Sequence, residues 1–144
     1  MEEARQLEVG SLSKPPIVVP ESASISKIVG ILQNENAYEV FVEEGERVKM
    51  VMIRDILRAT NVFTEKVGSF AFYVPVLSSR SPLAEAARLM MYYRIRALPI
   101  VANGRLSGKV DAISAISAIP GSYLSRHKAQ DIMTGNPISL VGED

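Results

Sequence analysis

Two acidic residues stand where an apolar strand is predicted to run into a helix. Asp55 follows Arg54 in the segment VKMVMIRDIL, and Asp111 precedes Ser114 by three residues in the segment GKVDAIS. The helix dipole stabilises an acidic side chain in the first turn of a helix by a few tenths to about 1 kcal/mol. A carboxylate at this place can also accept charge-assisted hydrogen bonds from a ligand, such as those from a ribose diol. The residue types leave both interpretations open.

The composition restricts the classes of function. The chain has 144 residues, of which 47% are hydrophobic, and this is enough apolar content for a packed core. Its formal net charge is zero, which argues against a general nucleic-acid-binding protein. The chain has no cysteine and only one histidine, His127, so no thiol nucleophile, disulfide or Cys-ligated zinc is available. We therefore expect no enzymatic activity and no bound metal.

No segment is predicted to target or cross a membrane. The first ten residues, MEEARQLEVG, are charged and lack the apolar stretch of a signal peptide. No apolar run approaches the roughly 20 residues that a membrane-spanning helix needs. We therefore expect a cytoplasmic protein with no membrane partner.

The sequence repeats itself at an interval of about 58 to 59 residues. Each copy is predicted to contain a short strand, an amphipathic helix, a β-hairpin and a short second helix. The first helix of the first copy places Ile25, Ile28, Val29 and Leu32 on one face. In the second copy, Ser81 and Pro82 are predicted to be the N-cap and the first residue of the helix. The hairpins are predicted to turn at Gly45 and at Asn103-Gly104.

These repeats define the predicted domain boundaries. The first copy spans residues 9–63 and the second spans residues 67–121, while residues 122–144 form a linker and the opening strand of a third copy. The segment AQDIMTGNPISLVGED is similar to VGSLSKPPIVVPES near the start of the chain. A lone strand cannot bury a face by itself, so either more repeats follow in the native protein or the tail packs on the two complete copies. We favour the first possibility, in which this chain is a fragment.

The ordered set of segments resembles the CBS domain, of which two copies form the pair often called a Bateman module. The resemblance lies in RALPIVANGRLSGKV, MVMIRDIL and DIMTGNPISL. It implies an α/β (α+β) fold of two β-α-β-β-α repeats packed as a pseudo-twofold pair, each a small sheet with two helices on one face. It also implies a regulatory module that binds AMP, ATP or S-adenosylmethionine between paired copies, requires no cofactor, and forms a homodimer through its helices.

The ligand motif of this family reads Gly, two apolar residues, Thr or Ser, two variable residues, then Asp. The first copy, KMVMIRD, keeps Asp55 but has Met52 at the hydroxyl position. The second copy, GKVDAIS, keeps Gly108 but has Asp111 at the hydroxyl position and Ser114 at the acidic position. Because a fixed carboxylate repels a phosphate in a partly buried cleft, we expect the second copy to suit a neutral or cationic ligand such as S-adenosylmethionine, or none.

The resemblance also implies which residues would surround an adenine ring. In the first copy these are Pro16, Ile17, Tyr38 and Val40. Lys14, Lys49 or Arg54 could supply positive charge there in place of the missing hydroxyl. In the second copy they are Tyr73, Val74, Ala97 and Pro99. Ordinary core packing is the alternative interpretation for each of these apolar residues.

Two other functions remain open at this point. The chain could be a dimerisation module without a ligand, with Ile113 and Ile116 on an apolar helix face that needs a partner. It could also be a nucleic-acid-binding regulator if arginines of both copies form one basic stripe. The residues of that stripe would be Arg54, Arg58, Arg94 and Arg96.

Overall fold

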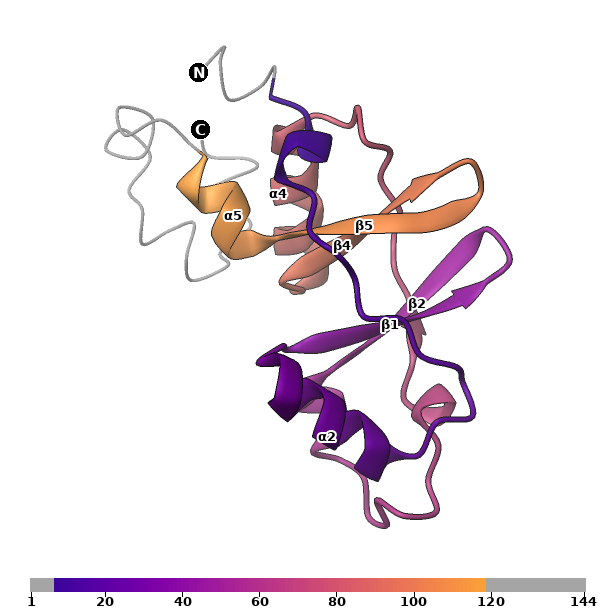
Figure 1. Ribbon diagram of the computed structural model, residues 1–144. Helices are drawn as coiled ribbons and strands as arrows, with labels where there is room; N and C mark the ends of the chain where they lie inside the picture. The colour runs from indigo at the N-terminus through magenta and orange to yellow at the C-terminus, as the bar shows by residue number, and fades with distance from the viewer. Residues whose placement is uncertain (1–6, 119–144) are drawn as a thin grey trace.

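Each predicted repeat folds as a β-hairpin with two helices, and the computed structural model describes residues 7–118 (Figure 1). The first repeat contains α2 (Ile25–Glu35), β1 (Glu39–Glu44), β2 (Arg47–Met52) and α3 (Ile53–Ile56). The second contains α4 (Leu83–Tyr93), β4 (Ala97–Ala102), β5 (Arg105–Asp111) and α5 (Ala112–Ser117). Three short elements complete the fold: η1 (Val9–Leu12), η2 (Val67–Ser69) and β3 (Phe72–Tyr73). This order confirms the predicted α/β fold of two repeats, in which the opening strand of each is reduced to a single parallel bridge, Val18 with Phe41 and Leu77 with Ile100.

Local signals set the ends of the long helices. Ser24 caps α2, because its hydroxyl accepts a hydrogen bond from the backbone N–H of Lys27 at 3.3 Å. Helix α4 begins one residue later than predicted, with Pro82 rather than Ser81 as its N-cap. The hydroxyl of Ser81 instead accepts a hydrogen bond from the backbone N–H of Ser78 at 3.0 Å. It therefore closes the preceding turn and does not cap the helix.

Both hairpins turn at the predicted glycines. Gly45 and Gly104 adopt φ angles of 65° and 75°, a conformation that glycine tolerates without strain. The pairing registers place Glu39 opposite Met52 in the first hairpin and Ala97 opposite Asp111 in the second. The open end of each hairpin thus leads directly into the second helix of its repeat.

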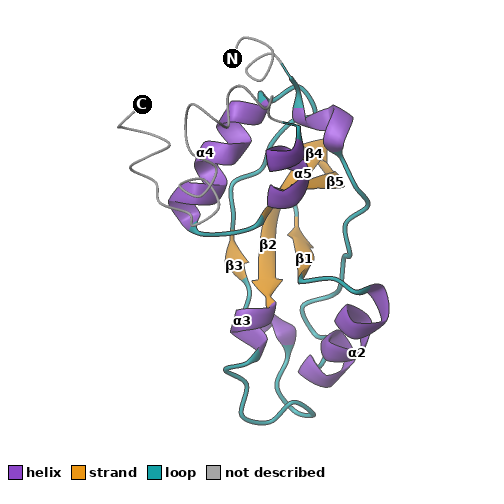
Figure 2. Ribbon diagram, turned by 90° about the vertical axis from the view of Figure 1, so that its left-hand side faces the viewer, coloured by secondary structure: helices purple, strands orange, loops and turns teal. Residues whose placement is uncertain are grey.

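The segment that precedes each repeat lies on the sheet of the other repeat. Strand β3 leads into the second repeat but pairs with β2 of the first, as Figure 2 shows. Likewise, Lys14 leads into the first repeat but forms an antiparallel bridge with Lys109 on β5 of the second. The backbone N–H groups of Val9 and Gly10 donate hydrogen bonds to the carbonyls of Ser81 and Ser79. Residues 9–14, which the sequence assigned to the first copy, therefore pack on the second.

The hydrophobic residues form two clusters, and one of them joins the repeats. Val40 and Val42 on β1 pack with α2 inside the first repeat. Phe41 lies between them in sequence and on the other face of the strand, where it joins the same cluster as Leu98 and Ile100 of the second repeat. The second core is therefore built by both repeats.

Two further expectations concern the membrane and the third copy. Within residues 7–118, no helix has the length and apolar character needed to span a bilayer. The predicted third copy, residues 122–144, lies outside the described residues, as does His127.

Candidate functional site

Asp111 is the N-cap of α5 and also half of an ion pair between the repeats. Its Oδ1 accepts a hydrogen bond from the backbone N–H of Ser114 at 2.8 Å, and its Oδ2 lies 3.0 Å from the Nζ of Lys14. The side chains of Lys14 and Asp111 are 50% and 22% exposed, so solvent reaches both. Desolvation raises the pKa of Asp111, but the hydrogen bonds from Ser114 and Lys14 outweigh it and lower that pKa below its usual value. The carboxyl group is therefore ionised at neutral pH.

A second ion pair between the repeats lies next to the first. Lys109, which is bridged to Lys14 across the strands, donates a hydrogen bond to the carboxylate of Glu39 at the start of β1. Both side chains are largely buried. This pair was not predicted from the sequence, although one signal for it was present. Successive side chains of a strand point to opposite faces, so Glu39 shares a face with Phe41, which is buried. The sequence therefore contained a carboxylate on a strand face that was expected to be buried.

The acidic residue of the first copy is enclosed by its own helix end. Asp55 is only 7% exposed, and its Oδ2 accepts a hydrogen bond from the backbone N–H of Met52 at 2.8 Å. Its Oδ1 lies 3.8 Å from the guanidinium of Arg58. Met52, which occupies the hydroxyl position of the motif, is itself buried in the core shared by the repeats. The structure thus shows the helix-end role of Asp55, and little of its carboxylate is left for a ligand.

Corresponding positions of the two repeats differ in polarity. The pair of Phe72 and Met50 in the first repeat corresponds to the pair of Lys14 and Lys109 in the second. Met52, which precedes α3, likewise corresponds to Asp111, which precedes α5. The carbonyl of Tyr38 accepts a hydrogen bond from the first residue of α3, as the carbonyl of Arg96 does from the first residue of α5. The position next to α5 is therefore polar, and its counterpart next to α3 is largely apolar.

The strand exchange corrects the predicted grouping of the site residues. Lys14, which was assigned to the first copy, lies against Lys109 and Asp111 of the second. Tyr73 and Val74 were assigned to the second copy, but they lie beside β2 of the first. The reason is physical: a short edge strand pairs wherever free backbone groups are available, and local sequence does not encode that partner.

The other predicted site residues lie at both hairpins. Ala97 and Pro99 are buried on β4, directly opposite Asp111 and Lys109. Pro16 and Ile17 are half-buried, and the carbonyl of Ile17 accepts a hydrogen bond from Phe41. Tyr38 is exposed at the start of β1, whereas Val40 is fully buried against α2. Core packing is thus the observed environment of Val40.

The four arginines considered for a basic stripe have different partners in the structure. All four arginines are exposed, and the Nη1 of Arg54 donates a hydrogen bond to the carbonyl of Arg94 at 3.1 Å. This bond places the side chain of Arg54 against the C-terminal end of α4 in the second repeat. Two of the four arginines already have partners within the protein, because Arg54 donates to the carbonyl of Arg94 and Arg58 forms an ion pair with Asp55.

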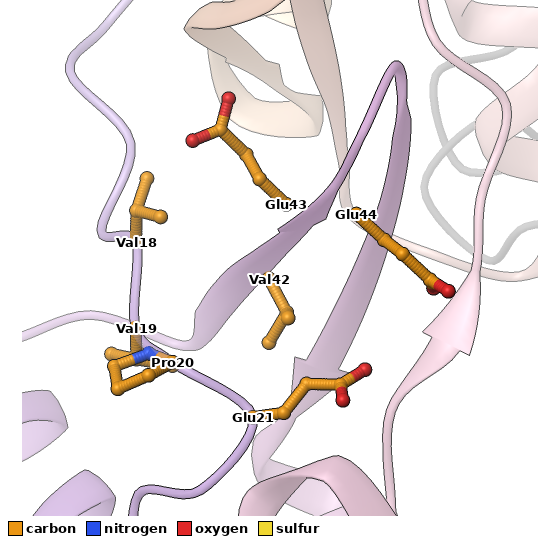
Figure 3. Close-up of a pocket in the computed structure, with 7 residues that line it drawn as sticks. All are labelled: Val18, Val19, Pro20, Glu21, Val42, Glu43 and Glu44. Carbon is orange, nitrogen blue, oxygen red and sulfur yellow. The ribbon is translucent and has the colours of Figure 1, made fainter.

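A hollow in the surface lies outside the predicted site. It is lined by Val18, Val19, Pro20, Glu21, Val42, Glu43 and Glu44 (Figure 3). Lys49 contacts Glu21 at 2.9 Å and Glu44 at 3.3 Å, and the hydrogen bond with Glu21 is the main reason that the pKa of Lys49 is raised. Glu43 accepts a hydrogen bond from the backbone N–H of Leu106 of the second repeat at 2.9 Å. The carboxylates of this hollow are therefore engaged within the protein, and none of them belongs to the predicted site.

The part of the chain from residue 7 to residue 118 contains no cluster of three or more metal-ligating side chains. All buried side-chain polar atoms in this part have a hydrogen-bond partner. No orphaned buried group there points to a missing ion or cofactor.

Comparisons with known proteins identify the fold. The family model of the CBS domain matches residues 8–61 and 72–121. A CBS domain protein from Pyrobaculum aerophilum, solved in complex with AMP, is 23% identical with a TM-score of 0.68, covering 83% of this chain and 97% of the other. A CBS domain pair solved with 5′-methylthioadenosine and S-adenosylmethionine is 23% identical with a TM-score of 0.67, covering 75% and 91%.

A third structure is part of a larger protein. The cytosolic domain of the Mg²⁺ channel MgtE in complex with ATP is 24% identical with a TM-score of 0.68, covering 81% of this chain and 50% of the other. A search of curated protein sequences finds no significant relative. At these identities the likeness to solved structures shows the fold alone.

Proposed function

The chain belongs to the CBS domain family, and from this premise we propose that it is a regulatory, non-enzymatic module that binds an adenosine-containing ligand between its repeats. One observation carries this proposal. Asp111 of the second repeat and Lys14 of the segment before the first repeat form a partly exposed ion pair where the two parts of the chain meet. A small polar ligand at this place would touch both.

The ligand class follows from what the related folds hold. Their structures were solved with AMP, with ATP, and with 5′-methylthioadenosine together with S-adenosylmethionine. Adenosine is the part that these compounds share. Pro16 and Ile17, which are half-buried in the segment that carries Lys14, supply apolar surface, and such surface suits a flat base.

The ligand would regulate the protein because its binding is linked to the relative arrangement of the two repeats. A ligand that contacts Lys14 and the start of α5 at the same time binds one relative arrangement of these segments better than others. It therefore shifts the population of the protein toward that arrangement. The shared core and the buried Glu39–Lys109 pair connect the site to both repeats.

The test is a thermal-shift titration with AMP, ATP, S-adenosylmethionine and 5′-methylthioadenosine. A ligand at a hundred times its Kd adds about 2.7 kcal/mol to the free energy of unfolding, which raises Tm measurably. We expect a shift in the wild-type protein that is reduced in Asp111→Asn, because asparagine keeps the helix cap but removes the charge. Glu35→Gln, at an exposed position in the last turn of α2, is the matched control and should keep the shift. If folded protein shows no shift with any of the four compounds, the chain is an interaction module without this ligand.

A second proposal concerns self-association, because the short second helices leave apolar side chains uncovered. Leu57, at the end of α3, is 79% exposed, and Ile113, on α5, is 71% exposed. We propose a homodimer that buries these two residues. Light scattering should then report a dimer for the wild-type protein and a monomer for the double variant Leu57→Glu, Ile113→Glu. Phe63→Glu changes an equally exposed apolar residue outside the helices and should remain dimeric. A monomeric wild-type protein would contradict this proposal.

A further inference from the structure

The residue that ends α4 has a left-handed backbone conformation. Arg94 follows α4 with φ 58° and ψ 47°, and Asn36 follows α2 with φ 54° and ψ 46°. Glycine and asparagine are the residues that adopt this conformation at low cost, so Asn36 suits its position and Arg94 does not. Arg94 is also exposed. A residue with an unfavourable backbone conformation on the surface points to a role of its side chain in binding.

Arg54 of the first repeat lies at the same place. Its Nη1 donates a hydrogen bond to the carbonyl of Arg94 at 3.1 Å, and a guanidinium has five N–H donors, so Arg54 keeps donors beyond this bond. The neighbouring carboxylate of Asp55 is enclosed and faces Arg58. Within residues 7–118, neither Arg54 nor Arg94 forms an ion pair. Two arginines without a carboxylate partner, one from each repeat, therefore adjoin at the end of α4.

Two tyrosines complete this surface. Tyr92 and Tyr93, the last residues of α4, are 71% and 47% exposed, and their rings meet edge to face with centroids 4.9 Å apart. Residues 88–96 include no acidic residue, and the residues of α5, which packs against α4, carry no charge. The α4-end surface, formed by Arg54, Tyr92, Tyr93 and Arg94, is therefore positively charged and partly aromatic.

The composition of the α4-end surface fits an acidic segment of a partner protein. Tyrosine and arginine are enriched at the centres of protein interfaces, and a guanidinium binds a carboxylate through two parallel hydrogen bonds. A second copy of the chain fits less well, because the arginines would face each other across a twofold axis through this surface. A nucleic acid also fits less well, because the chain as a whole has no positive excess.

We propose that the α4-end surface binds an acidic, partly apolar segment of another protein. Arg54 and Arg94 hold carboxylates of this segment, and Tyr92 supplies apolar contact. The interaction is separate from the adenosyl ligand of the proposed function and does not depend on it. Because Arg54 belongs to the first repeat and Arg94 to the second, the partner binds best while the two repeats keep the observed arrangement.

Fluorescence anisotropy with a short labelled peptide of glutamate and leucine tests this proposal. The matched peptide carries glutamine in place of glutamate, and a labelled oligothymidylate is the nucleic-acid probe. We expect the wild-type protein to bind the glutamate peptide about tenfold more tightly than the glutamine peptide, because charge-assisted hydrogen bonds are the strong ones. The oligothymidylate should bind more weakly than the glutamate peptide.

Arg94→Asn separates binding from folding. It removes the charge but suits the left-handed backbone, so the affinity for the glutamate peptide should fall about fivefold while Tm rises. A loss of binding together with a rise in Tm cannot come from unfolding. Arg54→Met should lower the affinity by a similar factor. Arg80→Asn, at an exposed arginine in the turn before α4, is the control and should keep the wild-type affinity.

Each contrary result overturns a different part of the proposal. Unchanged affinity in both Arg94→Asn and Arg54→Met would overturn the location of the site. Equal binding of the two peptides, or binding of neither to the folded wild-type protein, would overturn the acidic partner. Tighter binding of the oligothymidylate that is lost in Arg94→Asn would make this surface a nucleic-acid-binding site instead.

Discussion

At the scale of single residues, Gly108 explains why the segment before the first repeat can lie on β5. A Cβ atom at Gly108 would stand 2.0 Å from the Oγ of Ser13 and 3.4 Å from the carbonyl oxygen of Lys14. Glycine at this position of the motif therefore leaves room for the Ser13 side chain on the neighbouring segment, whether or not a ligand is bound.

We expect Gly108→Ala to lower the free energy of unfolding by about 1 kcal/mol, because the Ser13 side chain must turn away from the added Cβ. Urea denaturation measures this change. Gly30→Ala is the matched control, since no atom lies within 4 Å of the added Cβ in the middle of α2, and alanine there should stabilise by roughly 0.5–1 kcal/mol. Equal stability of Gly108→Ala and wild type would show that the segment does not need this contact.

Asp111 should make the stability depend on pH in the acidic range. The pKa of Asp111 is lowered in the folded protein, so its contribution to stability is complete above the ordinary aspartate pKa of about 4. That contribution is lost as the pH falls through the lowered pKa, where the carboxylate takes up a proton and the bond to Lys14 weakens.

Urea denaturation from pH 7 to pH 3 tests this prediction. We expect the free energy of unfolding to fall less steeply below pH 4 in Asp111→Asn than in the wild type. Glu46→Gln, in the exposed turn of the first hairpin, is the control and should follow the wild-type curve. Parallel curves for Asp111→Asn and wild type would mean that the ion pair contributes nothing to stability.

At the scale of elements, the exchange of segments between the repeats is the feature with the largest consequences. Val9 is fully buried in the shared core, and η1 is tied to the turn before α4 through backbone hydrogen bonds from Val9 to Ser81 and from Gly10 to Ser79. A change in the first ten residues is therefore expected to affect the second repeat, which begins some 60 residues later in the sequence.

Val9→Ala tests this arrangement and should lower the free energy of unfolding by about 2 kcal/mol, through lost burial and the cavity left behind. Hydrogen exchange should become faster in β5 and at the start of α4 than in α2. Val18→Ala, at a half-exposed valine of the same segment, is the control and should cost less than about 1 kcal/mol. Faster exchange confined to the first repeat would contradict the observed packing.

Much of the elements could be predicted from the sequence, because their signals are local. The spacing of Ile25, Ile28 and Leu32 and the turn at Asn103-Gly104 each fix one element without reference to the rest of the chain. The partners of Lys14 and Tyr73 could not be predicted, because strand pairing over a long sequence separation depends on the assembled fold. The net charge of the candidate site could not be predicted for the same reason. Asp111 was visible in the sequence, but Lys14, the partner that neutralises it, lies 97 residues away.

At the scale of the whole molecule, the two repeats are one structural unit. They share a core through Phe41 and Leu98, exchange short strands, and are joined by the buried Glu39–Lys109 pair. Through this coupling, a ligand at the proposed site would affect both repeats. It also predicts that the repeats unfold together.

Breaking the buried pair tests that coupling. We expect Glu39→Gln to lower the free energy of unfolding by about 3 kcal/mol, because Lys109 is left largely buried without a carboxylate partner. Circular dichroism in urea should still show a single transition, moved to lower urea concentration.

Lys109→Met added to Glu39→Gln should recover much of the loss, since no unpaired charge then remains in the interface. Arg105→Met removes the cation of an exposed pair between the repeats, with the Nε of Arg105 3.7 Å from Glu43, and should cost less than about 1 kcal/mol. Two separate transitions in the wild-type protein would mean that the shared core and the buried pair do not couple the unfolding of the two repeats. A ligand at the site beside α5 would then stabilise only the second repeat.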